Sequence, residues 1–326
     1  NVAVFGENIF YLNDKLSITP GFRFEYIKTE SDGFFRDINT DAAGNPIFNE
    51  IVEDQRSFER NFILLGLGTS YKPNDQLEIY GNISENYRSV TFADININNP
   101  AFSVDPDITD EEGFTTDVGV RGNYNRFVSY DASLFGLFYN DRIGFVEKKR
   151  DDNRLVSERS NVGDAFIYGV ESLVDFNLKK ILSLPDEYRL SYFINTSFIQ
   201  SEYTRSDQSG IEGNEVEFVP ELNFKTGLTL GYKDFRANVQ YSYLSEQFTD
   251  ASNSTEASLS GVIGKLPQYD ILDLSLSYTY NEWKLETGVN NILDEAYFTR
   301  RATGYPGPGI ITSPPRNWYA TLQVKF

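Results

Sequence analysis

Apolar and polar residues alternate along most of the chain with a period of two. In residues 272–280, for example, Leu and Tyr occupy every even position and Asp, Ser or Thr every odd one. Residues 16–26, 188–198, 222–232 and 236–243 repeat the pattern. This period is typical of β-strands whose two faces meet different surroundings. Helical patterns are absent, and about thirteen strands are predicted, beginning near residues 2, 15, 60, 76, 114, 128, 165, 188, 220, 235, 270, 283 and 317.

The connections between these strands alternate between short and long. Short turns are expected at residues 13–14, 73–75, 125–126, 178–187, 233–234 and 281–282, and long polar loops around 28–57, 88–112, 141–162, 202–217, 246–267 and 295–315. Since every second connection is long, all long loops should emerge at one end of an antiparallel sheet. Outer-membrane barrels have this asymmetry, with short periplasmic turns and long extracellular loops.

A large soluble β-sandwich or propeller would also show alternation. Three features favour a transmembrane barrel instead. The strands are about 10 residues long, which is enough for a tilted crossing. The chain has 26 Phe and 21 Tyr, many of them at strand ends where aromatic girdles lie, and its last residue, Phe326, is aromatic. The longest uncharged apolar run, about residues 62–68, is too short for a membrane helix.

Composition excludes most catalytic chemistry. The formal net charge of −19 disfavours nucleic acid as a partner. Because the chain contains no Cys and no His, thiol nucleophiles, imidazole-based triads and Cys- or His-ligated metals are excluded. No catalytic residues, no protein metal site and no cofactor are therefore predicted. The absence of Met and of a targeting segment suggests a fragment or a processed product.

Residues 289–309 and 318–326 resemble the C-terminal end of TonB-dependent outer-membrane receptors, and within that family they are most similar to ferric citrate transporters. The segments LSITPGFRFE (16–25) and NYRSVTFAD (86–94) agree with this resemblance, which covers essentially the whole chain. One departure is Pro315-Arg316, where the family often has Gly-Arg before the final strand.

The resemblance implies a 22-stranded barrel around an N-terminal plug. Residues 1–326 would then form a single partial domain, the last thirteen or so strands, with the plug and the first strands outside it. It also implies an outer-membrane location in a Gram-negative bacterium and TonB-coupled import of a ferric chelate. The expected partners are that chelate, an energy-coupling protein of the TonB type acting through the plug, and outer-membrane lipid and lipopolysaccharide. The terminal strand would face lipid through Trp318, Ala320, Leu322, Val324 and Phe326, and it would serve as the assembly signal.

Other functions are compatible with the same barrel. A TonB-dependent carbohydrate importer could use aromatic loops to stack on sugars, and a passive porin or a long-loop adhesin would need no plug. An outer-membrane enzyme would need carboxylates that converge at the rim. The residues that precede Asn1 in the full-length protein would distinguish active import from diffusion or adhesion.

Four residues are candidates for ligand contact. Arg300, Arg301 and Tyr305 belong to the last long loop, and Arg88 lies at another outer strand end. Guanidinium groups hold carboxylates through paired hydrogen bonds, as an anionic iron–citrate complex would require. The alternative is that these arginines offset nearby acidic loops or contact lipid phosphates.

Several other marked residues are predicted to be structural. Pro20-Gly21 is expected to form a bulge or bend, and Asn290, Asn291 and Asp294 are expected to stabilise the rim where a strand becomes a loop. The acidic run Asp105, Asp107, Asp110, Glu111 and Glu112, and the basic run 148–150, are expected to be solvated loops.

Overall fold

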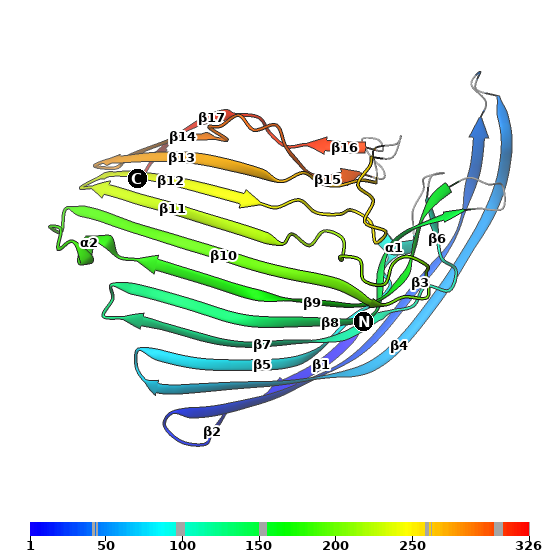
Figure 1. The fold of residues 1–326 in the computed structure, drawn as a ribbon, viewed down its shortest axis with the longest axis horizontal. Helices are drawn as coiled ribbons and strands as arrows, with labels where there is room; N and C mark the ends of the chain where they lie inside the picture. Colours follow the sequence, from blue (N-terminus) through cyan, green and yellow to red (C-terminus); the bar gives the residue numbers. More distant parts are fainter. Residues whose placement is uncertain are drawn as a thin grey trace.

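The computed structural model describes residues 1–40, 43, 45–95, 102–149, 155–257, 261, 263–302 and 309–325. Among these residues, thirteen strands form one antiparallel path in which sequence neighbours pair (Figure 1). They are β1 (Val2–Glu7), β3 (Leu16–Thr40), β4 (Pro46–Asn74), β5 (Leu77–Arg88), β7 (Glu111–Tyr124), β8 (Val128–Lys149), β9 (Leu155–Phe176), β10 (Tyr188–Arg205), β11 (Leu222–Tyr232), β12 (Phe235–Leu244), β13 (Tyr269–Tyr280), β14 (Trp283–Asn290) and β17 (Asn317–Val324). This path confirms the thirteen predicted strands.

Shorter elements decorate this sheet. β2 (Phe10–Tyr11) pairs with β3, β6 (Phe102–Val104) runs parallel to β9, and β15 (Phe298–Ala302) forms a separate hairpin with β16 (Gly309–Thr312). α1 (Phe92–Ile95) and α2 (Leu178–Ile181) are single turns. In the described part of the chain no helix is both long and apolar enough to cross a membrane.

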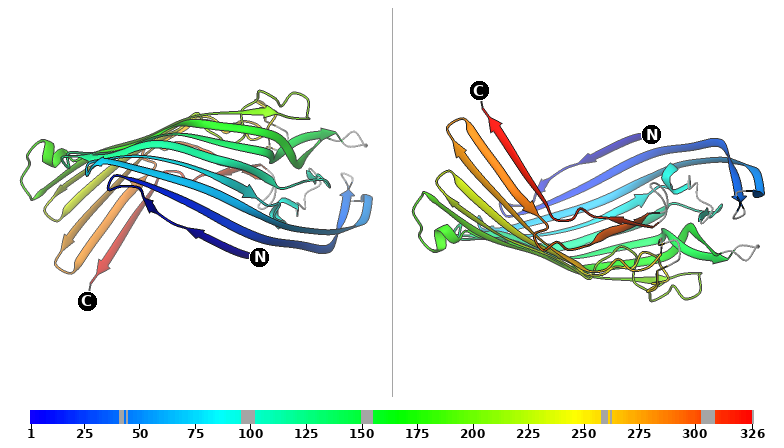
Figure 2. Two further views of the ribbon diagram at one scale, coloured as in Figure 1. Left: turned by 90° about the horizontal axis from the view of Figure 1, so that it is seen from below. Right: turned by 90° about the horizontal axis from the view of Figure 1, so that it is seen from above.

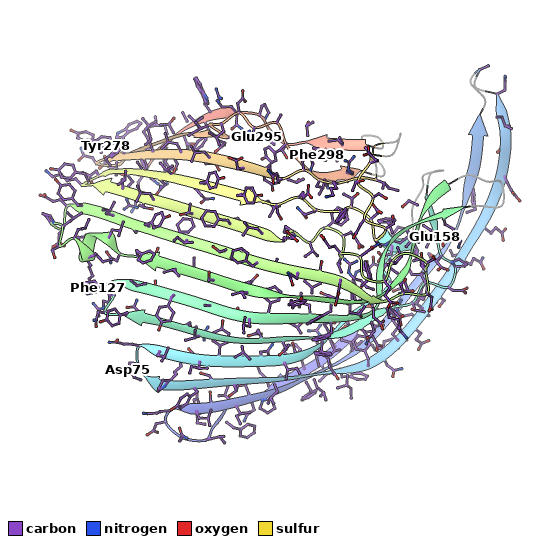
Figure 3. The ribbon with its side chains drawn as sticks, in the orientation of Figure 1. Asp75, Phe127, Glu158, Tyr278, Glu295 and Phe298 are labelled. Atoms are coloured by element: carbon purple, nitrogen blue, oxygen red, sulfur yellow. The ribbon has the colours of Figure 1, made fainter. Side chains whose placement is uncertain are left out.

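The sheet is curved, and both of its edges, β1 and β17, turn toward the same side (Figure 2). Short turns lie at one end, near Asp75, Phe127 and Tyr278, and longer connections lie at the other (Figure 3). We call these the turn end and the outer end. No described strand joins β1 to β17.

Register places the apolar residues of neighbouring strands on one face. Leu134 pairs with Val170, and Val170 pairs with Phe198. These three side chains are 62%, 43% and 58% exposed, so no second layer of protein covers them. A continuous exposed apolar face on an antiparallel curved sheet is the lipid-facing surface of a barrel. The opposite face carries charges such as Glu78 and Arg121, which pair across β5 and β7 and mark the lumen.

Aromatic residues mark the limits of the lipid-facing band. At the turn end Tyr124, Tyr188, Tyr232, Tyr278 and Trp283 are exposed. At the outer end Phe114, Phe138 and Phe166 stack side by side, with 4.2 Å between neighbouring ring centroids. From Tyr124 to Phe114 the strand β7 is about 34 Å long, which gives a height of roughly 24 Å along the barrel axis at a tilt of ~45°. This height matches the ~25 Å apolar band of outer-membrane barrels.

Two of the loops predicted from polar composition are instead long ribbons of paired strands, and a third, residues 295–315, contains the β15–β16 hairpin. β3 and β4 pair from Leu16↔Tyr71 up to Thr40↔Pro46, and β8 and β9 pair up to Lys149↔Leu155. Beyond the aromatic row neither face of a ribbon meets hydrocarbon, so apolar alternation is no longer imposed and the composition is that of a loop. The basic run is corrected accordingly: Lys148 lies in β8 and its Nζ lies 2.6 Å from Glu158 Oε1, whereas Arg150 lies outside the described residues.

Pro20 and Gly21 do not interrupt the pairing of β3 with β4, since Pro20↔Leu67 and Gly21↔Gly66 are in register. The break lies on the other side of β3. β1 ends opposite Gly21 and β2 begins opposite Ile18, and the amide of Asn8 donates to the carbonyl of Pro20 at 3.2 Å. Pro has no amide hydrogen to donate to a ladder, so the irregularity falls in the β1–β2 segment rather than as a bulge in β3.

The structural assignment of the rim residues is confirmed. Asn291 has a φ of 53° and is buried, and its side-chain amide exchanges two hydrogen bonds of 2.9 Å with the main chain of Glu295. Asp294 has a φ of 57° and accepts a hydrogen bond from the amide of Arg316. These bonds end β14 and also position the Pro315-Arg316 turn that precedes β17.

Candidate ligand-binding site

The described parts of the connection between β5 and β7, residues 89–95 and 102–110, fold back onto the ends of the strands. Val90, Ile95 and Ile108 from this connection are buried together with Ile143 of β8. Phe58 of β4 packs against the same group. This small apolar core holds α1 and the acidic run against the outer end of the sheet.

A second apolar core lies under the connections that follow β10 and β12. Val162, Ile167 and Tyr203 of β9 and β10 are buried against Val216 and Ala251. The outer end therefore has a dry protein interior above the level of the lipid-facing band, which lowers the local dielectric and strengthens charge interactions there.

Three arginines from different strands line one cavity of about 300 Å³ at this end. Arg88 ends β5, Arg142 lies in β8, and Arg159 lies in β9. Glu111 and Glu217 complete the charged lining of the cavity. The structure therefore brings the predicted residue Arg88 together with two arginines that the sequence did not single out.

The first arginine in this cavity, Arg142, belongs to a buried triad. Its Nη1 lies 2.5 Å from Glu217 Oε1 and donates to Tyr203 Oη at 2.8 Å, while Tyr203 Oη donates to Glu217 Oε2 at 2.6 Å. Tyr203 is 0% and Glu217 4% exposed. Burial and the adjacent Glu217 carboxylate raise the pKa of Tyr203, so the phenol stays protonated and donates. Burial opposes the charge of Arg142, but the Glu217 carboxylate outweighs it and raises the pKa of the guanidinium.

The other two arginines share one carboxylate, that of Asp94 in α1. Asp94 Oδ1 accepts from Arg88 Nη2 at 2.7 Å and from Arg159 Nη2 at 2.8 Å. Asp94 Oδ2 accepts from the amide of Thr91 at 2.9 Å and from its hydroxyl at 2.7 Å. Burial acts to raise the pKa of Asp94, but the hydrogen bonds from Thr91 and Arg159 outweigh it and lower the pKa to about 2.

The prediction that the acidic run is a solvated loop is wrong for Asp110 and Glu111. Asp110 accepts hydrogen bonds from the side chains of Arg60 and Tyr87 and from the amide of Val90. Glu111 is 6% exposed and accepts from the amide of Ile143 at 2.8 Å. Buried carboxylates need such partners, and the arginines and main-chain amides of the neighbouring strands supply them.

The charges in and around this cavity balance. Arg88, Arg142 and Arg159 face the carboxylates of Asp94, Glu111 and Glu217. An anionic ligand that entered the cavity would therefore exchange with a carboxylate of the protein. One donor is left over: Arg88 Nη1 is buried, has no hydrogen-bond partner, and lies 3.6 Å from Glu111 Oε2.

The predicted arginines of the last long loop lie elsewhere and differ from each other. Arg300 is exposed in β15. Arg301 is partly buried, and its Nη1 and Nη2 donate to the carbonyls of Gly261 at 2.8 Å and Lys265 at 2.7 Å. Neither residue lines the cavity that contains Arg88. Tyr305 lies outside the described residues.

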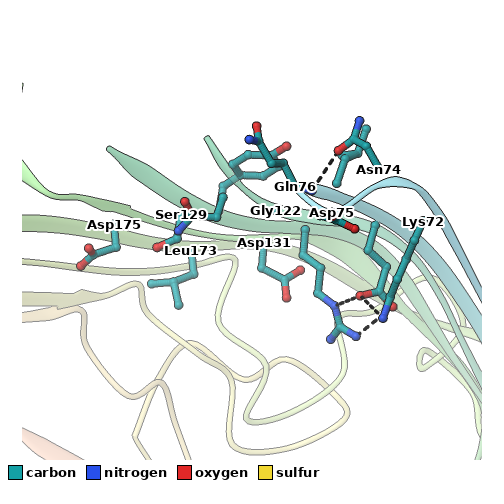
Figure 4. Close-up of a pocket in the computed structure, with 14 residues that line it drawn as sticks. Lys72, Asn74, Asp75, Gln76, Gly122, Ser129, Asp131, Leu173 and Asp175 are labelled. Carbon is teal, nitrogen blue, oxygen red and sulfur yellow. Dashed lines mark hydrogen bonds and ion pairs between the residues drawn. The ribbon is translucent and has the colours of Figure 1, made fainter. Parts of the chain in front are cut away.

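A larger pocket of about 590 Å³ opens on the lumen at the turn end (Figure 4). Glu78 accepts from Arg121 through both carboxylate oxygens, at 2.9 and 3.1 Å, and Lys72 lies 3.9 Å from the same carboxylate. Asp131 and Asp175 face the pocket from β8 and β9. Its carboxylates outnumber its cations, so it is less suited to an anionic ligand than the cavity at the outer end.

Comparison with known families decides the classification. The sequence profile described as "TonB dependent receptor-like, beta-barrel" matches residues 1–292. The chain belongs to this TonB-dependent receptor family. Its members are outer-membrane receptors and transporters of Gram-negative bacteria rather than enzymes. The resemblance seen in the sequence is thereby confirmed at the level of the family.

Solved structures of several transporters and uptake receptors share the fold. The ferric citrate transporter FecA in its unliganded form has a TM-score of 0.74 at 21% identity, over 99% of this chain and 44% of that one. The ferric yersiniabactin uptake receptor FyuA from Yersinia pestis has a TM-score of 0.71 at 19% identity, over 99% and 45%. The copper transporter OprC has a TM-score of 0.74 at 16% identity, over 99% and 47%. The chain thus spans less than half the length of each.

Sequence reasoning missed Arg142, Arg159, Asp94 and Glu217. One signal was available for Glu217, which stands alone between apolar residues in Val216-Glu217-Phe218-Val219. A lone carboxylate in such a run must find a buried cation or a donor. Arg159 and Asp94 gave no comparable signal, because they lie in polar segments whose folding back onto the sheet cannot be inferred from local pattern.

Proposed function

We propose that this chain is the barrel portion of a receptor that imports a ferric chelate of the ferric citrate type across the outer membrane, with energy from a TonB-type coupling protein. The coupling protein would act on parts of the receptor outside these residues. This chain would supply the wall, the outer vestibule and part of the ligand surface. The observation that carries the proposal is the convergence of Arg88, Arg142 and Arg159 on one luminal cavity at the outer end.

Arginine is suited to a chelate whose outer atoms are carboxylate oxygens. Its planar guanidinium matches a carboxylate with two parallel hydrogen bonds, and these bonds are stronger in a dry site. Iron would be cargo held by the chelator and not a metal bound by protein side chains. The chain contains no Cys, Met or His, the side chains that favour copper, so its residues fit a preformed oxygen-rich chelate better than a bare soft metal ion.

The other proposed contacts follow from the two faces of the sheet. The lipid-facing side would contact outer-membrane lipid and lipopolysaccharide, with the stacked Phe114, Phe138 and Phe166 at the outer boundary. The formal charge of −19 gives no basis for nucleic acid as a partner.

The test is ligand binding by the full-length receptor in detergent, measured by calorimetry with ferric citrate. Micromolar or tighter binding is expected, and Arg88→Ala should weaken it by about tenfold, the equivalent of one charge-assisted hydrogen bond. Arg121→Ala, at the turn end, is the matched control and should leave the affinity unchanged.

Three results would contradict the proposal. Absence of ferric citrate binding together with binding of a glycan would indicate a carbohydrate importer. Diffusion of small solutes through receptor-containing liposomes without an energy source would indicate a passive pore. Equal weakening by Arg88→Ala and Arg121→Ala would indicate a general charge effect rather than a site.

A further inference from the structure

We propose that Asp94 is an internal competitor for the ligand: in the unliganded receptor its carboxylate occupies the place of a ligand carboxylate between Arg88 and Arg159. The inference rests on the function proposed above and specifies its cargo. The receptor would select chelates that present a free, ionised carboxylate, and binding would release α1 from the arginines.

The two oxygens of Asp94 have different partners. Oδ1 faces the arginines, with Arg88 Nη2 at 2.7 Å and Arg159 Nη2 and Nε at 2.8 and 3.2 Å. Oδ2 accepts hydrogen bonds from the amide and the hydroxyl of Thr91. Oδ1 therefore makes the contacts that a ligand carboxylate would make, and Oδ2 anchors the side chain to Thr91, which immediately precedes α1.

Asp94 differs from the other two carboxylates in how it is held. Glu111 is in β7, and its carboxylate accepts a main-chain hydrogen bond from Ile143, so its removal would leave a strand amide unpaired. Glu217 is packed in an apolar core and bonded to both Tyr203 and Arg142. Asp94 is carried by a single helical turn outside the sheet. Among these three carboxylates, Asp94 is the one whose displacement leaves the strand pairing, the Glu111–Ile143 bond and the bonds of Glu217 intact.

Arg88 has unused capacity in the same place. Its Nη1 is buried without a hydrogen-bond partner, although its Nη2 is bonded to Asp94. Glu111 Oε2 lies 3.6 Å from this Nη1, beyond hydrogen-bond distance, so neither carboxylate satisfies it. A ligand carboxylate that bonded both Nη atoms would satisfy this leftover donor, which gives the exchange a favourable component.

The observed affinity is then set by the difference between two free energies: that of the ligand carboxylate with Arg88 and Arg159, and that of Asp94 with the same arginines. A ligand pays for displacing Asp94 and recovers that cost only if it supplies an ionised group of the same geometry. A chelate that covers its iron with neutral or purely phenolic groups would leave Arg88 and Arg159 without a counter-charge. The competitor thereby discriminates by ligand charge and shape.

The experiment compares Asp94→Asn with Asp107→Asn in the full-length receptor, with ferric citrate as the ligand and calorimetry as the readout. Both changes remove one negative charge from the same connection, but Asp107 is exposed and touches none of the three arginines. Asp94→Asn should tighten binding by about tenfold, since the ligand no longer displaces a carboxylate. Asp107→Asn should change it by less than about twofold.

A second variant, Thr91→Val, tests the same inference if Asp94→Asn does not fold. Thr91→Val removes the hydroxyl that bonds Asp94 Oδ2 but keeps the carboxylate and the overall charge. It should tighten binding in the same direction by a smaller factor. Hydrogen exchange of residues 89–95 should increase when ferric citrate binds to the wild-type receptor.

The outcomes separate this inference from the function on which it rests. If wild-type receptor binds ferric citrate but Asp94→Asn and Thr91→Val bind it equally or more weakly, Asp94 is not a competitor and the proposed function stands. Equal tightening by Asp94→Asn and Asp107→Asn would also overturn it, in favour of bulk charge. If wild-type receptor binds no ferric citrate, the proposed function fails, and citrate alone is then the probe. Unchanged exchange at residues 89–95 with citrate would reject the competitor as well.

Discussion

The two ends of the lumen contain similar charged pairs in opposite surroundings. At the turn end Arg121 holds Glu78 through two hydrogen bonds, and its side chain is 53% exposed. At the outer end Arg142 holds Glu217 with side-chain exposures of 18% and 4%. The difference comes from the connections, because the longer outer connections fold over their pair and exclude water, whereas short turns cannot. An Arg–Glu ion pair therefore stabilises the turn end only weakly, whereas breaking the buried pair at the outer end should be strongly destabilising.

The largest expected effect is that of Glu217→Ala. Removing this carboxylate leaves the guanidinium of Arg142 buried without its counter-charge and takes the acceptor from Tyr203, at a cost of about 3–5 kcal/mol. Hydrogen exchange of residues 199–205 in the full-length receptor should rise sharply, while β11 to β14 stay protected. Protection that remains at the wild-type level would mean that the outer core does not depend on this triad.

Arg301→Ala should have the next largest effect. Its guanidinium ties β15 to the β12–β13 connection through the carbonyls of Gly261 and Lys265, and losing both bonds should cost about 1–3 kcal/mol locally. Exchange at residues 263–266 should increase.

Arg300→Ala is the matched control for that change. Because Arg300 is exposed, its removal should shift stability by no more than about 0.5 kcal/mol. If calorimetry shows that Arg301→Ala weakens ferric citrate binding as strongly as Arg88→Ala does, the separation between the hairpin and the outer cavity is wrong.

The membrane-spanning part of this fold could be predicted because hydrocarbon imposes a simple rule on each residue. In β13 the alternation from Leu272 to Tyr280 follows directly from one face meeting lipid and the other meeting the lumen. The rule does not act on the upper parts of β3, β4, β8 and β9, which no hydrocarbon covers, and these parts were therefore predicted as loops. There the backbone ladder, which local composition does not report, continues the strand.

The candidate site was only partly predictable, because its members come from distant segments. Arg88 was found from its place at a strand end beside aromatic residues. Its partner Asp94 is close in sequence, but Arg159 and Glu111 are brought to it by pairing of β5, β7, β8 and β9. Arg301 shows the converse: its position in an outer loop favoured a ligand contact, and the pattern gave no sign that two of its nitrogens donate to main-chain carbonyls.

Strong acid should release Asp94 from Arg88 and Arg159. The pKa of this carboxyl is about 2 in the folded protein, below its ordinary value of 3.8. Its contribution to stability is therefore complete above about pH 4 and is lost as the pH falls toward 2. Hydrogen exchange of residues 89–95 should rise through this window. In Asp94→Asn the rise should be absent, and a rise of equal size in that variant would assign it to another carboxyl.

Arg121→Ala, the turn-end counterpart of Glu217→Ala, should also have a small effect. This side chain also lies over the ring of Tyr80, with its Cζ 5.2 Å from the centroid, but it is largely solvated. Losing both contacts should cost no more than about 1 kcal/mol in urea unfolding of the receptor. Raising the salt to 1 M shortens the screening length to about 3 Å, so the difference from wild type should shrink further. The effect of Glu217→Ala should persist at the same salt, because solvent ions do not reach that pair. If both variants respond to salt alike, the outer end is as wet as the turn end and the contrast between them fails.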